Sequence, residues 1–391
     1  MDFNISEDMK MVQTMARDFV KNQLIPLERQ VLGRDSDLVG SRQNLPLETE
    51  EKLVKLAQDM GLWGLNVPEV LGGAGLSTLG ICLVEEELAK TVVPFNFGDV
   101  TPILFDCNEQ QKAEYLIPML ERQKNAYFAL IEPGTDNNPS ALEMKAEKVN
   151  DNYILNGKKV AFAKKKADFA IVFAVTDSKK GIREGATCFL VDSNTPGFSV
   201  IGHGERTGWQ AQVTEPMTLA FDNCKVSPEK ILGEEGKAFS LGKKWLPTRR
   251  IVRGARCAGA AVRLLDVSVE HAKSWQSFGK GISDWTRIQA ALSDIDIDIH
   301  AARLMVFDAA WKADEGRDIH QEAAMVKVFS TEMLKRVANR TVQIKGGPAP
   351  ASELSLEILC QNMLEQNIAE RTMEVQRSII SGYILKLGAI I

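Results

Sequence analysis

The sequence predicts an α+β protein, mainly α, because helical patterns at both ends of the chain enclose a central stretch of strands. Apolar residues recur every three or four positions up to about Lys124 and again after Gly236. Short apolar runs separated by turn signals fill the stretch between. We therefore expect an N-terminal helical domain (1–125), a small antiparallel β-barrel or sandwich (126–236) and a C-terminal four-helix bundle (237–391).

The first region is expected to hold four helical segments with an apolar face. They are Met9–Val20, Leu53–Leu62, Leu79–Ala89 and Glu109–Met119. A glycine-rich turn at Leu71–Gly75 precedes the third of them. Helices of this kind, separated by short turns, indicate a packed helical domain.

The central region is expected to form six short strands. They are Tyr127–Ile131, Met144–Val149, Tyr153–Asn156, Phe169–Val175, Cys188–Val191 and Met217–Phe221. Turn signals at Asn156-Gly157, Pro196-Gly197 and Ser227-Pro228 separate them. The last region predicts four long helices, Ile251–Ala272, Trp285–Lys312, His320–Gln343 and Ile368–Leu385. Such lengths favour a bundle.

Composition excludes several classes of protein. A net charge of −5 argues against a nucleic-acid partner, because phosphate binding needs a cationic surface. No apolar run approaches the roughly 20 residues that cross a bilayer, and the first residues lack a secretory pattern. Six scattered cysteines suit free thiols in a reducing cytoplasm, which is the location we expect. Four dispersed histidines give no metal-ligand spacing, so we expect no metal.

Eight short motifs resemble those of one family when they are taken in chain order. They are Leu62–Glu69 with Gly72-Gly73 and Glu86–Ala89, Ala129–Gly134, Tyr153–Lys159, Leu219–Asp222 with Ile231–Gly233, Phe278–Lys280, Ala301–Arg303, Gln343–Gly347 and Glu370–Arg377. Over nearly its full length the chain resembles the acyl-CoA dehydrogenase family. Each motif is weak alone, and the order makes the set specific.

The resemblance implies removal of two hydrogens from an acyl-CoA thioester, with FAD as the hydride acceptor. Glu370 matches the family's general base, which takes the proton next to the thioester carbonyl. The alternative is a surface glutamate on a helix that also carries Glu365 and Glu374. Arg371 stands where the family usually has glycine, and it either pairs with Glu370 and narrows the pocket or points outward.

A second substrate-binding candidate is Arg250, which matches an arginine that lines the family's acyl pocket. The alternative is ordinary surface charge, since Arg249, Arg253 and Arg256 lie on the same helix. Pro247 replaces an aspartate that helps to hold the CoA moiety in the family.

The resemblance also implies a set of flavin contacts, some from the same subunit and some from its neighbour. The matching positions are Phe128, Leu130, Ile131, Asn137, Ala161, Phe162, Trp275, Phe278, Gln343, Gly346, Gly347, Thr372 and Glu374. Asn137 replaces a serine but can still donate a hydrogen bond, whereas three other positions depart from the family more strongly. Ile131 replaces a threonine that bonds the isoalloxazine, Ala161 replaces a ring-stacking tryptophan, and Trp275 replaces the neighbour's arginine that pairs with the pyrophosphate.

These departures leave alternatives open. FAD is bound more weakly than usual, or is completed by a different partner chain, with the run Lys164–Lys166 as a replacement cation or a solvated turn. The leading interpretation is an acyl-CoA dehydrogenase that passes electrons to an electron-transfer flavoprotein-type acceptor, in a homotetramer or an α2β2 heterotetramer. The rivals are a non-redox acyl-CoA lyase, hydratase or isomerase on the same scaffold, and a companion subunit that completes another chain's site.

Overall fold

The computed structural model describes residues 5–31, 45–134, 142–163, 166–203, 215–346 and 372–386. Contacts within the chain define two compact units. The first comprises Met1–Leu65, Gly75–Phe97 and Leu246–Ile391, and the second comprises Asn66–Ala74 and Gly98–Trp245. The expected domain boundaries at residues 125 and 236 stay predictions. None of the described helices is long and apolar enough to span a bilayer.

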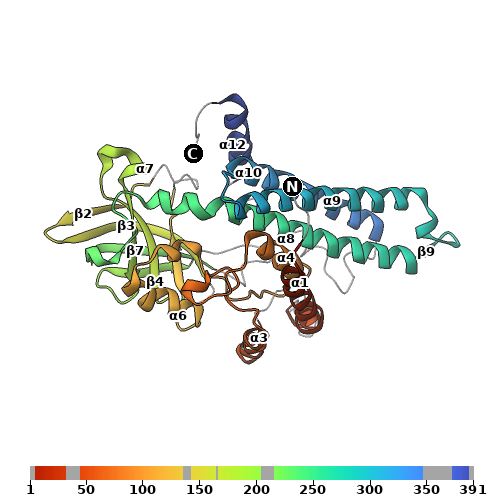
Figure 1. The fold of residues 1–391 in the computed structure, drawn as a ribbon, viewed down its shortest axis with the longest axis horizontal. Coiled ribbons are helices and arrows are strands. Elements are labelled where there is room, and N and C mark those ends of the chain that lie inside the picture. Colours follow the sequence, from red (N-terminus) through yellow and green to blue (C-terminus); the bar gives the residue numbers. More distant parts are fainter. Residues whose placement is uncertain are drawn as a thin grey trace. The chain divides into compact units, whose positions relative to one another are not determined.

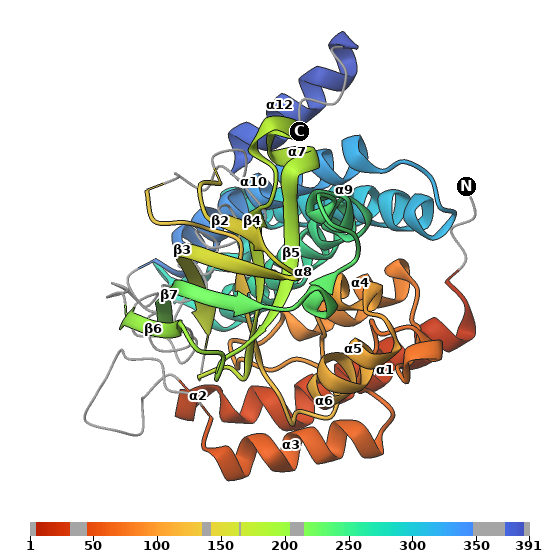
Figure 2. The same ribbon diagram turned by 90° about the vertical axis from the view of Figure 1, so that its left-hand side faces the viewer.

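The N-terminal part of the first unit confirms three of the expected helices. Its elements are α1 (Glu7–Phe19), η1 (Val20–Leu24), η2 (Ile25–Leu27), α2 (Glu28–Val31), α3 (Leu47–Asp59) and α4 (Thr78–Leu88). Ser6 and Ser77 cap α1 and α4 by accepting a main-chain N–H with the side-chain oxygen. Apolar side chains of α1, α3 and α4 form one core, and Figure 2 shows α1 and α3 side by side.

The C-terminal part of the same unit confirms the bundle. Its long helices are α8 (Ala238–Ser274), which belongs to this unit from Leu246 onward, α9 (Thr286–Asp314), α10 (His320–Lys345) and α12 (Met373–Leu385). A short hairpin of β9 (Gln276–Ser277) and β10 (Lys280–Gly281) joins α8 to α9 (Figure 1). α8 begins well before the expected Ile251 and runs through Pro247. A proline costs a helix about 3 kcal/mol, and apolar packing on both sides of it, at Leu241 and Ala255, offsets this cost.

Two contacts fix the relative direction of α8 and α10. Gly254 lies against Val326, and the Ser268 hydroxyl donates to Thr341 Oγ1 at 3.2 Å. From the first contact to the second, α8 advances by 14 residues (268 − 254) and α10 by 15 (341 − 326), so the helices are parallel. Their C-terminal ends therefore lie at the same end of the bundle, beside the hairpin.

The described residues of the second unit form an eight-stranded sheet. Its strands are β1 (Ala126–Ala129), β2 (Lys145–Val149), β3 (Asn152–Ala163), β4 (Phe169–Val175), β5 (Ala186–Asp192), β6 (Phe198–His203), β7 (Glu215–Val226) and β8 (Ile231–Leu232). The order is β6-β7-β3-β2-β4-β5-β8, with β1 beside β4, and Figure 2 shows β6, β7 and β3 as neighbours. Pairing is antiparallel except where β4 meets β1 and β2 in parallel.

Strand β4 explains how the sheet is covered. Its alternate side chains enter two different cores: Phe169, Ile171 and Phe173 one, Ala170 and Val172 the other. A strand buried on both faces is a continuous apolar run, which is why the sequence predicted β4 with its observed bounds. The first core also takes side chains from η4 (Pro102–Asp106), η5 (Lys112–Leu116) and α6 (Ile117–Leu120). The short helix α5 (Glu109–Gln111) leads into η5.

The sequence underestimated the adjacent strands β6, β7 and β3 of this sheet. β6 was not expected at all, and β3 and β7 each have 12 residues and extend beyond the predicted segments. Among the described strands, β6 pairs only with β7, and its described side chains alternate between exposed and half-buried, so β6 carries no apolar run. The five described cysteines are free and buried, and Cys360 lies outside the described residues.

Candidate active site

In the second unit, the structure brings two of the expected flavin segments together. β1 leads into Leu130 and Ile131, and the Val160 N–H donates to the Ile131 main-chain oxygen at 2.8 Å. The Ile131–Val160 bridge therefore lies beside Ala161 and Phe162 on β3. The sequence alone does not predict that these two segments are adjacent, because almost 30 residues lie between them.

A buried ion pair supports this segment. Lys159 is 0% exposed, and its Nζ donates to Glu132 Oε1 at 2.7 Å and to the Leu130 main-chain oxygen at 3.2 Å. The Glu132 carboxylate also accepts the N–H groups of Glu143 and Met144, at 2.8 and 3.0 Å. Burial lowers the pKa of Lys159 to about 8, although Glu132 opposes the shift. The pair thus anchors the flavin-side segment to β3 and to the start of β2.

The side chains of this region differ in direction. Ala161 is buried in the core of the sheet, whereas the next residue, Phe162, is 48% exposed, as the alternation of a strand requires. Phe128 is half-buried and packs against Phe173 and the edge of Trp245, with ring centroids 5.6 and 6.2 Å apart. Phe162 is therefore the aromatic face that this segment presents.

In the first unit, a second group of expected flavin residues gathers at the hairpin end of the bundle. Trp275 and Phe278 belong to the α8–α9 connection, and Gln343 and Gly346 end α10. Phe278 and Gly279 form the hairpin turn with left-handed φ values of 50° and 73°. A phenylalanine in this conformation is strained, and its side chain is 95% exposed beside Trp285, 6.3 Å away and nearly parallel.

Trp275 makes a stack instead of a charged contact. Its ring lies on the ring of the buried His271, with centroids 5.3 Å apart and 24° between the planes. Burial, and to a lesser extent the positive charge of Lys345, lower the pKa of His271. The imidazole is therefore neutral at pH 7, and neither ring supplies the charge that the family's arginine would carry.

The third group lies at the start of α12. Thr372 precedes the helix, and the Thr331 hydroxyl of α10 donates to Met373 Sδ at 3.1 Å. Hydrogen bonds from its own main-chain N–H and from the Thr372 side chain lower the pKa of Glu374. Glu370, Arg371, Asn137 and Gly347 lie outside the described residues, so their roles stay predictions.

Arg250 is not surface charge. It is 3% exposed within α8, and the alternative that grouped it with exposed arginines is wrong. A buried guanidinium has to be compensated by polar groups, which suits a binding role better than a solvated face. Its role toward the substrate stays a prediction.

Comparison with known proteins identifies the fold and the family. The models of the acyl-CoA dehydrogenase N-terminal, middle and C-terminal domains match residues 6–123, 127–224 and 239–385. The chain belongs to the acyl-CoA dehydrogenase family. It is an FAD-dependent oxidoreductase of that family, which confirms the fold class, the cofactor and the class of enzyme expected from the motifs.

Three members illustrate the similarity. (R)-benzylsuccinyl-CoA dehydrogenase of Thauera aromatica is 32% identical over 99% of this chain and 98% of its own length. Caffeyl-CoA reductase-Etf complex subunit CarC of Acetobacterium woodii is 30% identical over 97% and 99% of the two chains. The solved butyryl-CoA dehydrogenase of Megasphaera elsdenii is 31% identical with a TM-score of 0.84, covering 98% of this chain and 100% of that one.

The described residues of this acyl-CoA dehydrogenase supply some of the contacts expected for FAD. Phe162 and Phe278 expose aromatic faces, which proteins usually bury and which a planar ring system would cover. The neutral stack of Trp275 on His271 offers nothing that pairs with a pyrophosphate charge. The aromatic contacts are therefore present, whereas the charged contact has to come from another residue.

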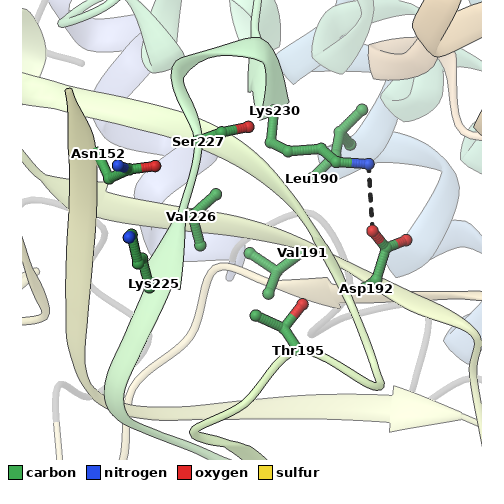
Figure 3. A pocket seen from close by; sticks show the side chains of 9 residues that line it. All are labelled: Asn152, Leu190, Val191, Asp192, Thr195, Lys225, Val226, Ser227 and Lys230. Carbon is green, nitrogen blue, oxygen red and sulfur yellow. Dashed lines mark ion pairs between the residues drawn. The ribbon is translucent and has the colours of Figure 1, made fainter.

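A surface pocket of about 330 Å³ lies elsewhere on the sheet unit (Figure 3). It is lined by Leu190, Val191, Val226 and polar residues that include Asp192 and Lys230, which form an ion pair at 3.1 Å. Another lining residue, Asn152, begins β3, nine residues before Ala161 (161 − 152). At about 3.3 Å per residue, the two are about 30 Å apart along the strand. This pocket is therefore remote from the flavin-side segment.

Proposed function

We propose that the chain catalyses α,β-dehydrogenation of an acyl-CoA thioester with Glu370 as the general base. The observation that carries the proposal is the match of all three family domains, in order, from residue 6 to residue 385. The neighbourhood of Ile131, Val160 and Phe162 supports it further, because these positions match flavin contacts and are adjacent in the structure.

Each proposed residue has a distinct task. The Glu370 carboxylate takes the proton from the carbon next to the thioester carbonyl, and FAD, when bound, supplies the acceptor for the hydride from the neighbouring carbon. Phe162 on the sheet, and Phe278 with Gln343 on the bundle, hold the cofactor. Arg250 and Arg371 are the proposed substrate contacts. Proximity matters most here, since a weakly acidic C–H reacts only with a base held in contact.

We infer that electrons leave through an electron-transfer flavoprotein-type acceptor and that the enzyme is a tetramer. The name of the relative CarC describes a subunit of an Etf complex, which supports such a partner. Thr331, which contacts the start of α12, is 14 residues from Lys345 (345 − 331), or about 21 Å along α10. Thr372, at the start of α12, and Trp275, at the hairpin end, therefore lie at different positions along one bundle. This separation suits contacts to two different FAD molecules, as a tetramer with cofactors shared between subunits requires.

A spectrum of the purified protein tests the proposal. Flavin absorption that is bleached by an acyl-CoA is the expected result, and a panel of butyryl-CoA, phenylpropionyl-CoA and benzylsuccinyl-CoA ranks the acyl groups. Colourless protein that converts a CoA thioester would favour the non-redox lyase, hydratase or isomerase. Colourless, inactive protein that gains flavin only on co-expression with a related chain would favour the companion subunit.

Replacement of Glu370 tests the base directly. Glu370→Gln should lower kcat by at least about 10³-fold while leaving flavin content and acyl-CoA binding unchanged, because the amide keeps the shape but accepts no proton. Glu365→Gln is the matched control on the same sequence segment and should retain activity. Undiminished turnover of Glu370→Gln removes Glu370 from the mechanism.

A further inference from the structure

Because Trp275 cannot pair with the FAD pyrophosphate, the candidates for this contact are the cations at the hairpin end of the bundle. Four of them come from this end: Lys273 on α8, Lys280 on β10, Arg287 on α9 and Lys345 on α10. Arg287 lies over the ring of Trp285, 5.8 Å from its centroid. Lys273 and Lys280 are exposed, whereas Lys345 is half-buried.

The helix register brings Lys345 to the Trp275 stack. The hydrogen bond between Ser268 and Thr341 aligns the parallel helices α8 and α10. One turn further along each helix stand His271 and Lys345, and His271 carries Trp275 on its ring. The effect of the Lys345 charge on His271 agrees with this proximity. Lys345 and Trp275, the residue that replaces an arginine, thus both lie near His271 at the same end of the bundle.

We propose that Lys345 supplies the positive charge that binds the FAD pyrophosphate at the hairpin end of the bundle, in place of the arginine that the family has at position 275. The inference rests on the proposed function, since it needs FAD bound at that end. Within the residues that the structure describes, Lys345 forms no ion pair, so its charge is available to an anion. The neutral His271 and Trp275 then serve as an apolar platform beside it.

The test measures FAD affinity rather than turnover. The full-length protein is stripped of flavin, and the Kd for FAD is obtained from the quenching of flavin fluorescence. Lys345→Gln should raise this Kd about tenfold, the equivalent of about 1.4 kcal/mol for a lost charge-assisted contact. Trp275→Arg in the Lys345→Gln background should restore it. Lys273→Gln, the exposed lysine at the same end, should leave it within about twofold.

A second measurement assigns the effect to the pyrophosphate. ADP, which carries the pyrophosphate without the flavin, should compete with FAD, and its inhibition constant should rise with Lys345→Gln by a similar factor. Adenosine lacks phosphate, and its inhibition constant should not change.

Three results would contradict the role of Lys345, and a fourth would contradict the proposed function instead. Unchanged FAD affinity in Lys345→Gln overturns the inference, as does an equal loss in Lys273→Gln, which would indicate only overall charge. No rescue by Trp275→Arg also contradicts it, because position 275 would then not share the task. Wild-type protein that binds no FAD at all would instead refute the proposed function.

Discussion

Raising the pH should stabilise this protein through Lys159. Its side chain is fully buried, and burial lowers its pKa from the usual 10.5 to about 8. Between these values the unfolded chain binds more protons at this lysine than the folded chain does. The buried charge therefore lowers the unfolding free energy by its full amount below about pH 8, and this loss disappears as the pH rises to 10.5.

The size of the effect follows from the shift. A shift of about 2.5 pKa units at 1.36 kcal/mol each corresponds to about 3 kcal/mol of unfolding free energy. Lys159→Met provides the reference, because methionine has a similar shape and no charge to titrate. Glu132 keeps its two main-chain N–H donors, those of Glu143 and Met144, in this variant.

The assay is urea unfolding of the full chain, wild type and Lys159→Met, at steps from pH 7 to 10.5. Other groups titrate in this range, and they cancel in the difference between the two proteins. The wild type should gain about 3 kcal/mol relative to the variant as the pH rises. A difference that stays constant, or one that shrinks, would refute the assignment of a charged, desolvated lysine to this core.

Two further substitutions test the expected flavin contact of Phe162 and the ion pair between Glu86 and Arg303. Phe162→Ala should raise the Kd for FAD about tenfold by removing an aromatic face, whereas Phe162→Tyr should not, and flavin fluorescence distinguishes them. Glu86→Gln should lower the unfolding free energy by about 3 kcal/mol, because it leaves the partly buried Arg303 guanidinium without its carboxylate. Differential scanning calorimetry measures this loss, and a melting temperature within a degree of the wild type would contradict it.

Much of the fold could be predicted because its main elements depend on local patterns. The apolar run of β4 and the long amphipathic repeats of α9 and α10 each specify their element without help from the rest of the chain. The continuation of α8 through Pro247 could not be predicted this way, since tertiary packing outweighs the local cost of a proline.

The buried pair Lys159–Glu132 left a signal that sequence reasoning missed. Lys159 has the same parity along β3 as Tyr153, Leu155 and Ala161, all of which are buried. Side chains of one parity point to one face of a strand, so a lysine among them has to be buried and needs a carboxylate. The identity of that carboxylate, 27 residues earlier in the chain, still required the structure.

The replacement cation shows a second limit of sequence reasoning. The lysine run 164–166 was the candidate because it lies next to the altered stacking segment, and of its members the structure describes only Lys166, which is exposed. Lys345 is far from Trp275 in sequence, and although it lies within the motif Gln343–Gly347, it is not one of the motif's expected flavin positions. It becomes a candidate only when α8 and α10 are known to be parallel, because an antiparallel arrangement would carry it to the far end of the bundle. A compensating substitution is thus recognised by the direction of two helices, and the paired variants at 275 and 345 test that direction as well as the charge.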